Sequence, residues 1–274
     1  NDKYALLKRD PRHCQRLFGV TFALVGNIIG KVQKHFEEKL EQNPISKRGL
    51  NPGISIENQV LLTLEYLMQY PTFLALGASY GISESYANKI YHKIRPVLAE
   101  LFGLKNPERI RFKHVQNAII DVAAQPIERP EKEQEKYYNR HKKKIVKAQL
   151  IINQEDNSIV HCRVETEGRK SDIKVFRETP VEIDKKVKIK GDLGYKGIKK
   201  DHPNSKVPHK KPKGGELTEK QKKQNKSFRQ VRVKVEHAIR RCKCFRIVKE
   251  TFRNRRRHIG EVWAIICGLV NANI

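Results

Sequence analysis

The stretches that decide the fold are NAIIDVAAQP at residues 117–126 and KIKGDLGYKG at residues 188–197. We expect one strand over 115–122 with Asp121 at its end, next to Val122, and another over 185–191 that ends just before Asp192. Strands that lie side by side in one sheet bring their ends close together. Two neighbouring carboxylates repel, so the arrangement predicts a divalent cation between them. The alternative is that each aspartate only begins a turn, where this residue type is favoured.

A third carboxylate, Glu236, lies on a predicted helix at residues 221–244. Five charged residues recur there at steps of three and four and therefore line one face of the helix: Arg229, Arg232, Glu236, Arg240 and Lys243. Carboxylates hold hard cations and flanking arginines grip phosphates, so this stripe is typical of metal-dependent phosphodiester chemistry. The alternative is that Glu236 is only an ion-pair partner, one helical turn away from Arg232 or Arg240.

The rest of the second half of the chain alternates between strand and helix patterns. We expect a hairpin with strands at 144–152 and 158–165, a short helix at 172–178, a strand at 245–249 and a closing helix at 260–272. This order of elements indicates an α/β (α+β) fold in which a mixed sheet is flanked by helices.

The first hundred residues are predicted to be helical. Apolar residues at steps of three and four predict one helix over 17–40, and prolines and glycines in 42–55 predict a linker. Helices at 56–69, 72–79 and 83–102, with a turn at 80–82, have the layout of a helix-turn-helix. We expect Pro96 to kink or interrupt the last of these helices.

The third helix of that motif carries the candidate DNA contacts. Four of its polar side chains can meet phosphates or base edges and are assigned to DNA binding: Asn88, Lys89, His92 and Lys93. The alternative is a plain helical hairpin that does not touch DNA, because residues 51–110 are nearly neutral in charge.

The charge of the chain points to a polyanionic partner. The formal net charge is +27, and residues 111–274 hold 42 Lys and Arg against 20 Asp and Glu, compared with 15 and 10 in residues 1–110. A folded chain with this excess is expected to bind nucleic acid. The apolar stretches fall short of the roughly 18 residues that a spanning helix needs, which argues against a membrane protein. Five cysteines at irregular spacing predict a reducing compartment and no disulfide framework.

Seven stretches resemble, in the same order, the bacterial insertion-sequence transposases of the DDE superfamily, in the group numbered five, and also the Harbinger-type transposases. They are IIDVAAQPIERP (119–130), the YY-to-KKK run (137–144), GRKSD (168–172), DLGYKG (192–197), PHKKPKG (208–214), VEHAIRRCKCFRI (235–247) and FRNRRR (252–257). The predicted helix-turn-helix at about 52–103 is similar to the DNA-binding module of the same family.

The resemblance implies three domains and a set of roles. Residues 1–50 would form a helical region that is a candidate for oligomerisation, 51–110 a DNA-binding helix-turn-helix, and 111–274 an RNase H-like catalytic domain. The implied catalytic triad is Asp121, Asp192 and Glu236, holding two Mg²⁺ ions that Mn²⁺ can replace, with Asp121 bridging them. Arg232 and Lys243 match the family's arginine and lysine around the glutamate, whereas Arg229, Ala123, Ser171 and Asn139–Arg140 depart from its pattern.

The activity that the resemblance implies is DNA transposition. A DDE endonuclease and strand transferase cleaves the ends of an insertion sequence and joins the freed 3′-hydroxyls to target DNA. The implied partners are double-stranded DNA and further copies of the chain, in a homodimer or larger assembly, in the bacterial cytoplasm at the nucleoid. Two other interpretations stay open: a catalytically silent or domesticated DNA-binding protein, and another RNase H-like nuclease such as a junction resolvase.

Overall fold

The structure, a computed structural model, describes residues 2–42, 53–138, 143–165 and 167–274. Most of the predicted linker at 42–55 and the Asn139–Arg140 step therefore lie outside the described residues. The chain divides into two compact units. The first contains residues 1–103, 244–249 and 264–274, and the second contains 104–243 and 250–263. Both C-terminal pieces of the first unit lie within residues 111–274, the range predicted for the catalytic domain.

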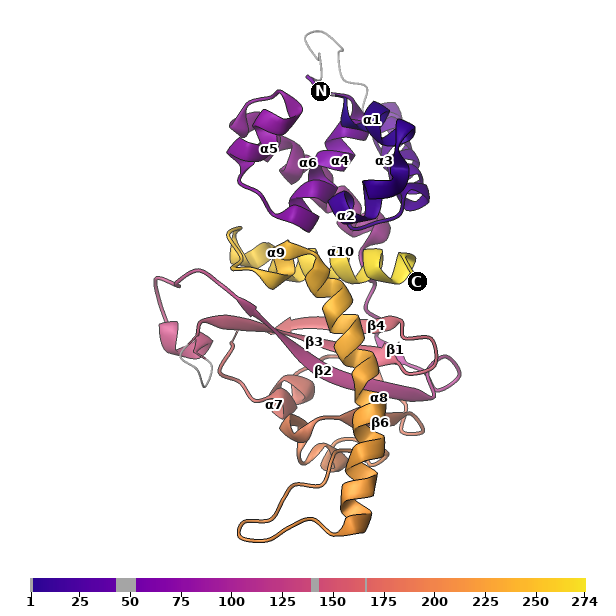
Figure 1. The fold of residues 1–274 in the computed structure, drawn as a ribbon, viewed down its shortest axis with the longest axis vertical. Helices are drawn as coiled ribbons and strands as arrows, with labels where there is room; N and C mark the ends of the chain where they lie inside the picture. The colour runs from indigo at the N-terminus through magenta and orange to yellow at the C-terminus, as the bar shows by residue number, and fades with distance from the viewer. Residues whose placement is uncertain (1, 43–52, 139–142, 166) are drawn as a thin grey trace. The chain divides into compact units, whose positions relative to one another are not determined.

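The first unit is built of helices, which Figure 1 shows in indigo to purple with a yellow C-terminal part. Their bounds are α1 Lys3–Arg9, η1 Pro11–His13, α2 Cys14–Phe18, α3 Phe22–Gln42, α4 Ile56–Gln69, α5 Phe73–Tyr80, α6 Glu84–Phe102 and α9 Arg246–Lys249, with the end of α10 Ile259–Ala272. No helix among the described residues combines the length and the apolar character needed to cross a membrane.

The predicted helix-turn-helix is confirmed by α4, α5 and α6. Ser55, Thr72 and Ser83 cap the three helices, since each side chain accepts a hydrogen bond from a backbone N–H in the first turn. Gly81 closes the turn between α5 and α6 with a φ of +70°, which favours glycine. Pro96 lies inside α6, which continues through it to Phe102, so the predicted interruption is wrong.

The predicted single helix over 17–40 is also wrong. Gly19, with a φ of +77°, ends α2, and α3 begins only at Phe22. Val25, Ile29 and Val32 on α3 are buried, and this helix packs against α4 and α6 inside the same unit. Its apolar face is therefore already covered within the chain, so the oligomer contact hypothesised for this helix would need another surface.

The second unit is built on a five-stranded mixed sheet with the order β4-β3-β2-β6-β7. The strands are β2 Asn117–Pro126, β3 Ile145–Asn153, β4 Ile159–Glu165, β6 Lys188–Gly191 and β7 Ser205–Lys206, while β1 Arg109–Ile110 and β5 Glu182–Ile183 form a separate parallel pair. The β3–β4 hairpin is antiparallel, as predicted, and β2 pairs antiparallel to β3 but parallel to β6. This mixed sheet with its helices confirms the predicted fold class.

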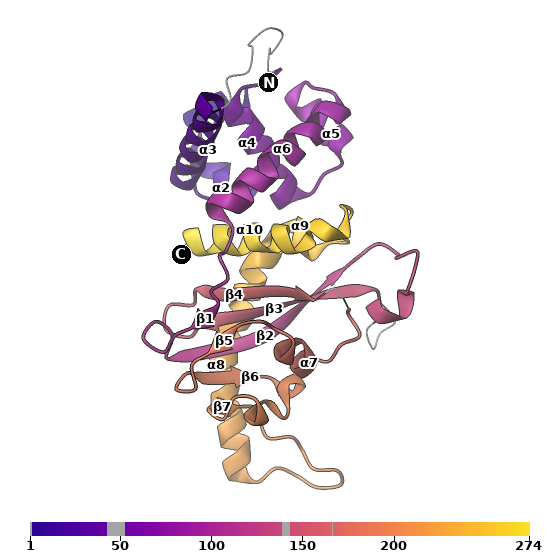
Figure 2. The ribbon, with the colours of Figure 1, turned by 180° about the vertical axis from the view of Figure 1, so that it is seen from behind.

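Helices cover both faces of this sheet. The long helix α8, Glu219–Cys244, crosses the face turned to the viewer in Figure 1, and α7, Asp172–Arg177, lies on the opposite face, as Figure 2 shows from behind. Side chains alternate along β2 accordingly. Ile120 joins the buried cluster that Ile173 and Phe176 of α7 contact, whereas Gln125 accepts a hydrogen bond from buried Trp263 of α10 at 2.7 Å.

The remaining elements test the other predictions. The helices predicted at 172–178, 221–244 and 260–272 are confirmed as α7, α8 and α10. The strand predicted at 245–249 is wrong, because residues 246–249 form the helix α9. Phe245, Ile247 and Val248 are fully or almost fully buried, and α9 packs on α4, so tertiary packing outweighs the β propensity of this segment.

The helix-turn-helix turn gives a stability prediction. A Cβ atom on Gly77 would lie 2.7 Å from the Ile82 carbonyl oxygen, which is backbone and cannot rotate away. Gly77→Ala should therefore lower the free energy of unfolding by about 1–3 kcal/mol in urea denaturation. The matched control is Gly26→Ala on α3, which meets nothing within 4 Å and should stabilise by about 0.5–1 kcal/mol. Equal effects of the two substitutions would contradict the close approach at Gly77.

Candidate active site

Two aspartates come together where β6 ends beside β2. These strands are parallel, and the last paired residues are Ile120 and Gly191, so Asp121 and Asp192 are the next residues in the same register. The expectation that the first strand ends at Asp121 is wrong, because β2 continues to Pro126. Asp121 therefore lies inside a strand whose neighbour on one side has just ended, next in register to Asp192.

Asp192 also begins a turn. Its Oδ1 accepts a hydrogen bond of 2.7 Å from the backbone N–H of Gly194, and it caps the short helix η3, Leu193–Tyr195. The turn-forming role that the sequence left open as an alternative is thus present together with the proximity to Asp121. The two roles are compatible, because the turn fixes the direction in which this carboxylate points.

A third aspartate, Asp172 at the start of α7, lies next to Asp192. A Cβ atom added to Gly194 would collide with Asp172 Oδ2 and lie 2.9 Å from Asp192 Oδ1, so the two carboxylates flank this glycine. Lys147 on β3 donates to Asp172 Oδ1 at 2.8 Å, and its side chain is only 16% exposed. The site therefore holds a carboxylate and a lysine to which the sequence analysis gave no role.

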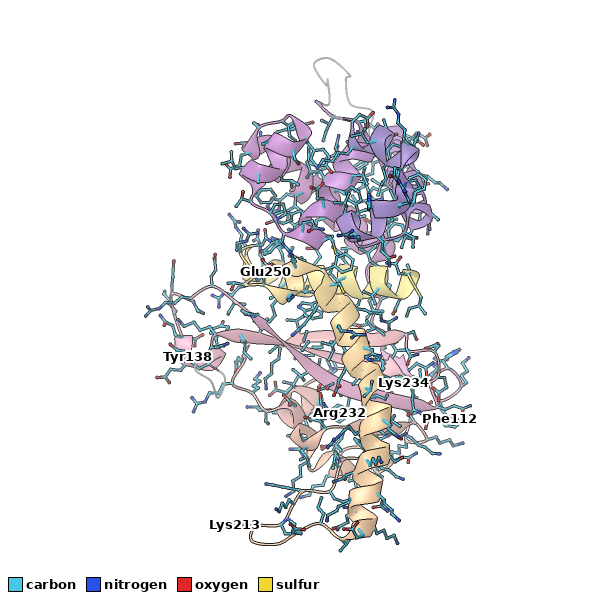
Figure 3. The ribbon with its side chains drawn as sticks, viewed as in Figure 1. Phe112, Tyr138, Lys213, Arg232, Lys234 and Glu250 are labelled. Carbon is cyan, nitrogen blue, oxygen red and sulfur yellow. The ribbon has the colours of Figure 1, made fainter. Side chains whose placement is uncertain are left out.

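Glu236 is connected to Asp121 through Arg232. The Nη2 atom of Arg232 lies 3.3 Å from Asp121 Oδ2 and 3.0 Å from Glu236 Oε1. Because one nitrogen contacts both oxygens, the two carboxylates lie within the sum of these distances of each other. The ion pair one helical turn apart, which was the alternative role for Glu236, is therefore present and reaches Asp121 as well. Figure 3 labels Arg232 on α8, where the helix crosses the sheet.

Side chains of α8 fix this helix on the sheet. Lys234 Nζ donates to the backbone oxygen of Gln154 at 2.6 Å, Arg241 donates to that of Asn157 at 2.9 Å, and Lys243 Nζ donates to that of Ala124 at 3.1 Å. Gln154 and Asn157 belong to the turn between β3 and β4. The helix is thereby attached to β2 and to the β3–β4 turn, and this attachment positions Arg232 over Asp121.

The electrostatics of Asp121 are unfavourable without a further cation. Burial raises the pKa of Asp121 from its ordinary 3.8 to about 6, and the nearby charges of Asp192 and Asp172 raise it further, against the lowering effects of the Val122 N–H and of Arg232. Burial and the same carboxylates also raise the pKa of Tyr195, whose hydroxyl donates to Gln149. Negative charge is thus crowded here beyond what Arg232 and Lys147 neutralise.

A groove of about 1150 Å³ opens at two of these carboxylates, Asp172 and Asp192. We call it the carboxylate groove, and its lining residues are Glu135, Tyr138, Lys147, Gly168, Arg169, Lys170, Ser171, Asp172, Asp192, Leu193, Gly194, Lys196 and Lys210. Five of them are basic, so an anionic polymer that enters the groove meets positive charge before it reaches the aspartates. The groove collects the GRKSD and DLGYKG stretches, which are distant in sequence, into one surface.

The donor set suits a hard divalent cation. Carboxylate oxygens are the ligands that Mg²⁺ prefers, and the pKa of Asp121 is raised mainly by burial and further by the nearby Asp192 and Asp172, a cost that such an ion would relieve. No three His, Cys, Asp or Glu side chains of the described residues lie in an arrangement that could already hold a metal ion. The reason at Glu236 is visible, because the Arg232 guanidinium occupies the space between that residue and Asp121.

The other predicted DNA contacts are distributed over both units. On α8, Arg229 and Arg240 are exposed, whereas Lys243 is partly buried and bonded to Ala124. On α6, Lys89 and His92 are exposed and Asn88 is partly buried. Lys93 is also exposed, and it donates to Gln59 Oε1 at 3.1 Å and lies over the Phe36 ring. The DNA-binding roles of all these residues stay predictions.

Asp172 and Lys147 left weak signals in the sequence. Asp172 was quoted within GRKSD but was interpreted only as the start of a short helix. Lys147 lies between the buried residues Val146 and Ala148 of β3. Because lysine is rarely buried without a partner of opposite charge, this position indicates that Lys147 forms an ion pair. The sequence does not show that either residue lies near Asp192, because this depends on the packing of α7 against β3 and η3.

Comparisons with known proteins agree with this geometry. A family model described as "DDE superfamily endonuclease" matches residues 120–271, and another, "Helix-turn-helix of DDE superfamily endonuclease", matches residues 53–104. The chain is 33% identical over 265 residues to a protein of Microchaete diplosiphon named as a transposase for insertion sequence element IS702, covering 95% of this chain and 94% of that protein. It is 26% identical over 208 residues to one of Streptomyces albus G named as a transposase for insertion sequence element IS112, covering 74% and 75%.

The raised pKa of Asp121 predicts a pH-dependent stability effect. The folded state binds a proton more tightly than the unfolded chain does, so stability falls as pH rises from about 4 to about 6. Asp121→Asn removes the buried charge and should raise Tm in EDTA at pH 8, by an amount equivalent to at most about 3 kcal/mol. The gain should shrink at pH 4.5, where the carboxyl is protonated.

The control for this effect is Asp184→Asn. The Phe112 N–H and Arg109 lower the pKa of Asp184, so its charged form is favoured by folding. That substitution should lower Tm at pH 8, with a sign opposite to that of Asp121→Asn. A Tm that is lower for Asp121→Asn than for the wild type at both pH values would contradict the prediction that the buried charge of Asp121 destabilises the folded state.

Proposed function

The chain belongs to the DDE endonuclease superfamily, among its transposases, and we propose that it cleaves DNA at the ends of an insertion sequence and joins the freed 3′-hydroxyls to target DNA. The observation that carries the proposal is the adjacent register of Asp121 and Asp192 where β6 ends, together with the Arg232 guanidinium that contacts both Asp121 and Glu236. These residues come from two strands and a helix that are far apart in the sequence. A regulator that only binds DNA has no need of this arrangement.

In the proposed reaction, Asp121, Asp192 and Glu236 would hold divalent cations, with Mg²⁺ as the natural choice for carboxylate donors. Bound there, such ions would activate water or a DNA 3′-hydroxyl and stabilise the departing oxygen. The DDE superfamily uses divalent metal generally, and the pairing with Mg²⁺ is part of the proposal.

Arg232 would act on the DNA as well as on the carboxylates. Its Nη2 atom is engaged by Asp121 and Glu236, while its Nε atom is buried and has no hydrogen-bond partner among the described residues. The Arg232 side chain as a whole is 28% exposed, so DNA can reach its guanidinium, and a phosphate oxygen is a suitable acceptor for that group. We therefore assign Arg232 to orienting the scissile phosphodiester beside Asp121, with exposed Arg229 and Arg240 contacting the same backbone further along α8.

The helix-turn-helix would supply the recognition that the carboxylate groove lacks. Lysines and arginines in a groove contact phosphates and read no sequence, whereas a helix in the major groove reads base edges. Asn88, Lys89 and His92 on α6 are the residues proposed for that reading. Assembly as a homodimer or larger complex on paired DNA ends completes the proposal.

Substitution of one aspartate separates catalysis from binding. Asp192→Asn keeps the turn acceptor but removes the charge, and should reduce cleavage of labelled element ends in Mg²⁺ about a thousandfold or more, since several kcal/mol of charge stabilisation are lost. DNA binding, measured by gel shift, should change by less than about threefold, because the phosphate-contacting cations are untouched. Asp201→Asn, on the surface ion pair with Arg177, is the matched control.

The outcomes discriminate between the candidate functions. Sequenced joined products that need Mg²⁺ and are lost in Asp192→Asn identify a transposase. Cutting of branched DNA without joining would identify a junction resolvase, and full function of Asp192→Asn would identify a DNA-binding protein without catalysis.

Salt should weaken DNA binding steeply. Each phosphate contact releases a counterion, so contact with at least six phosphates predicts a loss of affinity of roughly 10³-fold or more between 50 and 200 mM salt. Fluorescence anisotropy with a labelled duplex at several salt concentrations measures the slope. A nearly flat slope would contradict binding through the basic surface.

A further inference from the structure

A second groove, of about 910 Å³, adjoins the carboxylate groove within the same unit. We call it the lysine groove after the six lysines that line it: Lys190, Lys196, Lys199, Lys200, Lys206 and Lys210. In the described part of the chain, no aspartate or glutamate lines it, in contrast to the three that line the carboxylate groove. The two grooves therefore differ in chemistry although they are neighbours.

The positive charge of the lysine groove is not balanced by the protein. Lys196, Lys199, Lys200, Lys206 and Lys210 are exposed and form no ion pair with any residue that the structure describes. Burial, and then the charge of Lys206, lower the pKa of Lys190, whose Nζ donates to Gln154. Like charges held this close together destabilise the fold unless an anion normally lies among them.

The two grooves share a wall, and the proposed catalytic residue Asp192 is adjacent to this wall in the sequence. Leu193, Lys196 and Lys210 line both grooves, and Leu193 directly follows Asp192. The other side of the lysine groove is formed by α8, through residues such as Gln224 and Phe228. An anionic strand in the lysine groove would thus run past the position where the carboxylate groove presents Asp192.

Joining two DNA molecules requires such a second surface. Both the element end and the target must lie at the same carboxylates, and each brings a dense line of phosphate charge that repels the other. A single groove whose cations are partly neutralised, as by the Lys147–Asp172 and Lys170–Glu178 pairs, offers too little positive charge for both.

We propose that the lysine groove binds the backbone of the target DNA while the carboxylate groove holds the element end. The absence of carboxylates from the lysine groove makes it unsuited to hold the bond that is cut first. Lysines contact phosphates without reading bases, which suits the DNA that the helix-turn-helix does not select. This inference rests on the proposed function and assigns a surface that the catalytic triad does not include.

The test compares joining with end cleavage in one pair of variants. Lys199→Glu/Lys206→Glu reverses two charges in the lysine groove. Lys185→Glu/Lys186→Glu makes the same change in net charge at exposed positions before β6, outside both grooves. Each protein is incubated in Mg²⁺ with uncut ends, to measure cleavage, and with pre-cut ends plus a plasmid, to measure joining. The ratio of joining to cleavage should fall about tenfold or more in the groove variant, since phosphate contacts to the target are lost, and should stay near the wild-type ratio in the control.

Other results would overturn the assignment. An equal loss of cleavage and joining would assign the lysine groove to binding the element end, and wild-type rates of both reactions would show that it does not bind either DNA. Failure of the wild-type protein to cut or join any DNA would instead contradict the proposed function. A photoreactive residue at position 206 gives an independent reading, because it should crosslink to the plasmid, and crosslinking to the element end would refute the proposal.

Discussion

The ionic contact between Asp121 and Arg232 is the constraint on which the second unit depends. A carboxylate inside a strand of a mostly buried sheet is expensive, and its raised pKa records that cost. The Val122 N–H offsets part of it, and α8 adds a cation by bringing Arg232 to within 3.3 Å. The helix must therefore cross the sheet at this point, and its bonds to Gln154, Asn157 and Ala124 hold it there. The geometry of the candidate site follows from this crossing.

The two faces of the sheet contribute different side chains to the site where β6 ends beside β2. The α8 face supplies Arg232 and Glu236, and the α7 face supplies Asp172 with its partner Lys147. Gly194 allows Asp172 and Asp192 to approach each other, because any side chain at position 194 would fill the space between their carboxylates. The early end of β6 then leaves Asp172, Asp192 and Lys147 on the lining of the carboxylate groove.

Particular elements show how far the sequence could predict the fold. Long segments with a clear period were predicted well: α4, α6, α8, α10 and the β3–β4 hairpin all form where the apolar spacing indicates. The failures occurred where tertiary packing outweighs local preference. Phe245–Lys249 is rich in β-prone residues but forms α9, because its apolar side chains are buried with α4. The periodicity over 17–40 continued past Gly19, whose left-handed backbone breaks the helix.

The sequence by itself pointed to three acidic residues as candidates for the site, to the basic face of α8 and to the order of motifs that resembles the superfamily. These are properties of residue type and spacing. Only the tertiary structure decided that Asp121 lies within its strand, that Arg232 stands between it and Glu236, and that Asp172 and Lys147 join the site. Those facts depend on strand register and on the path of α8 across the sheet. Register and crossing are set by long-range packing, which leaves no local pattern in the chain.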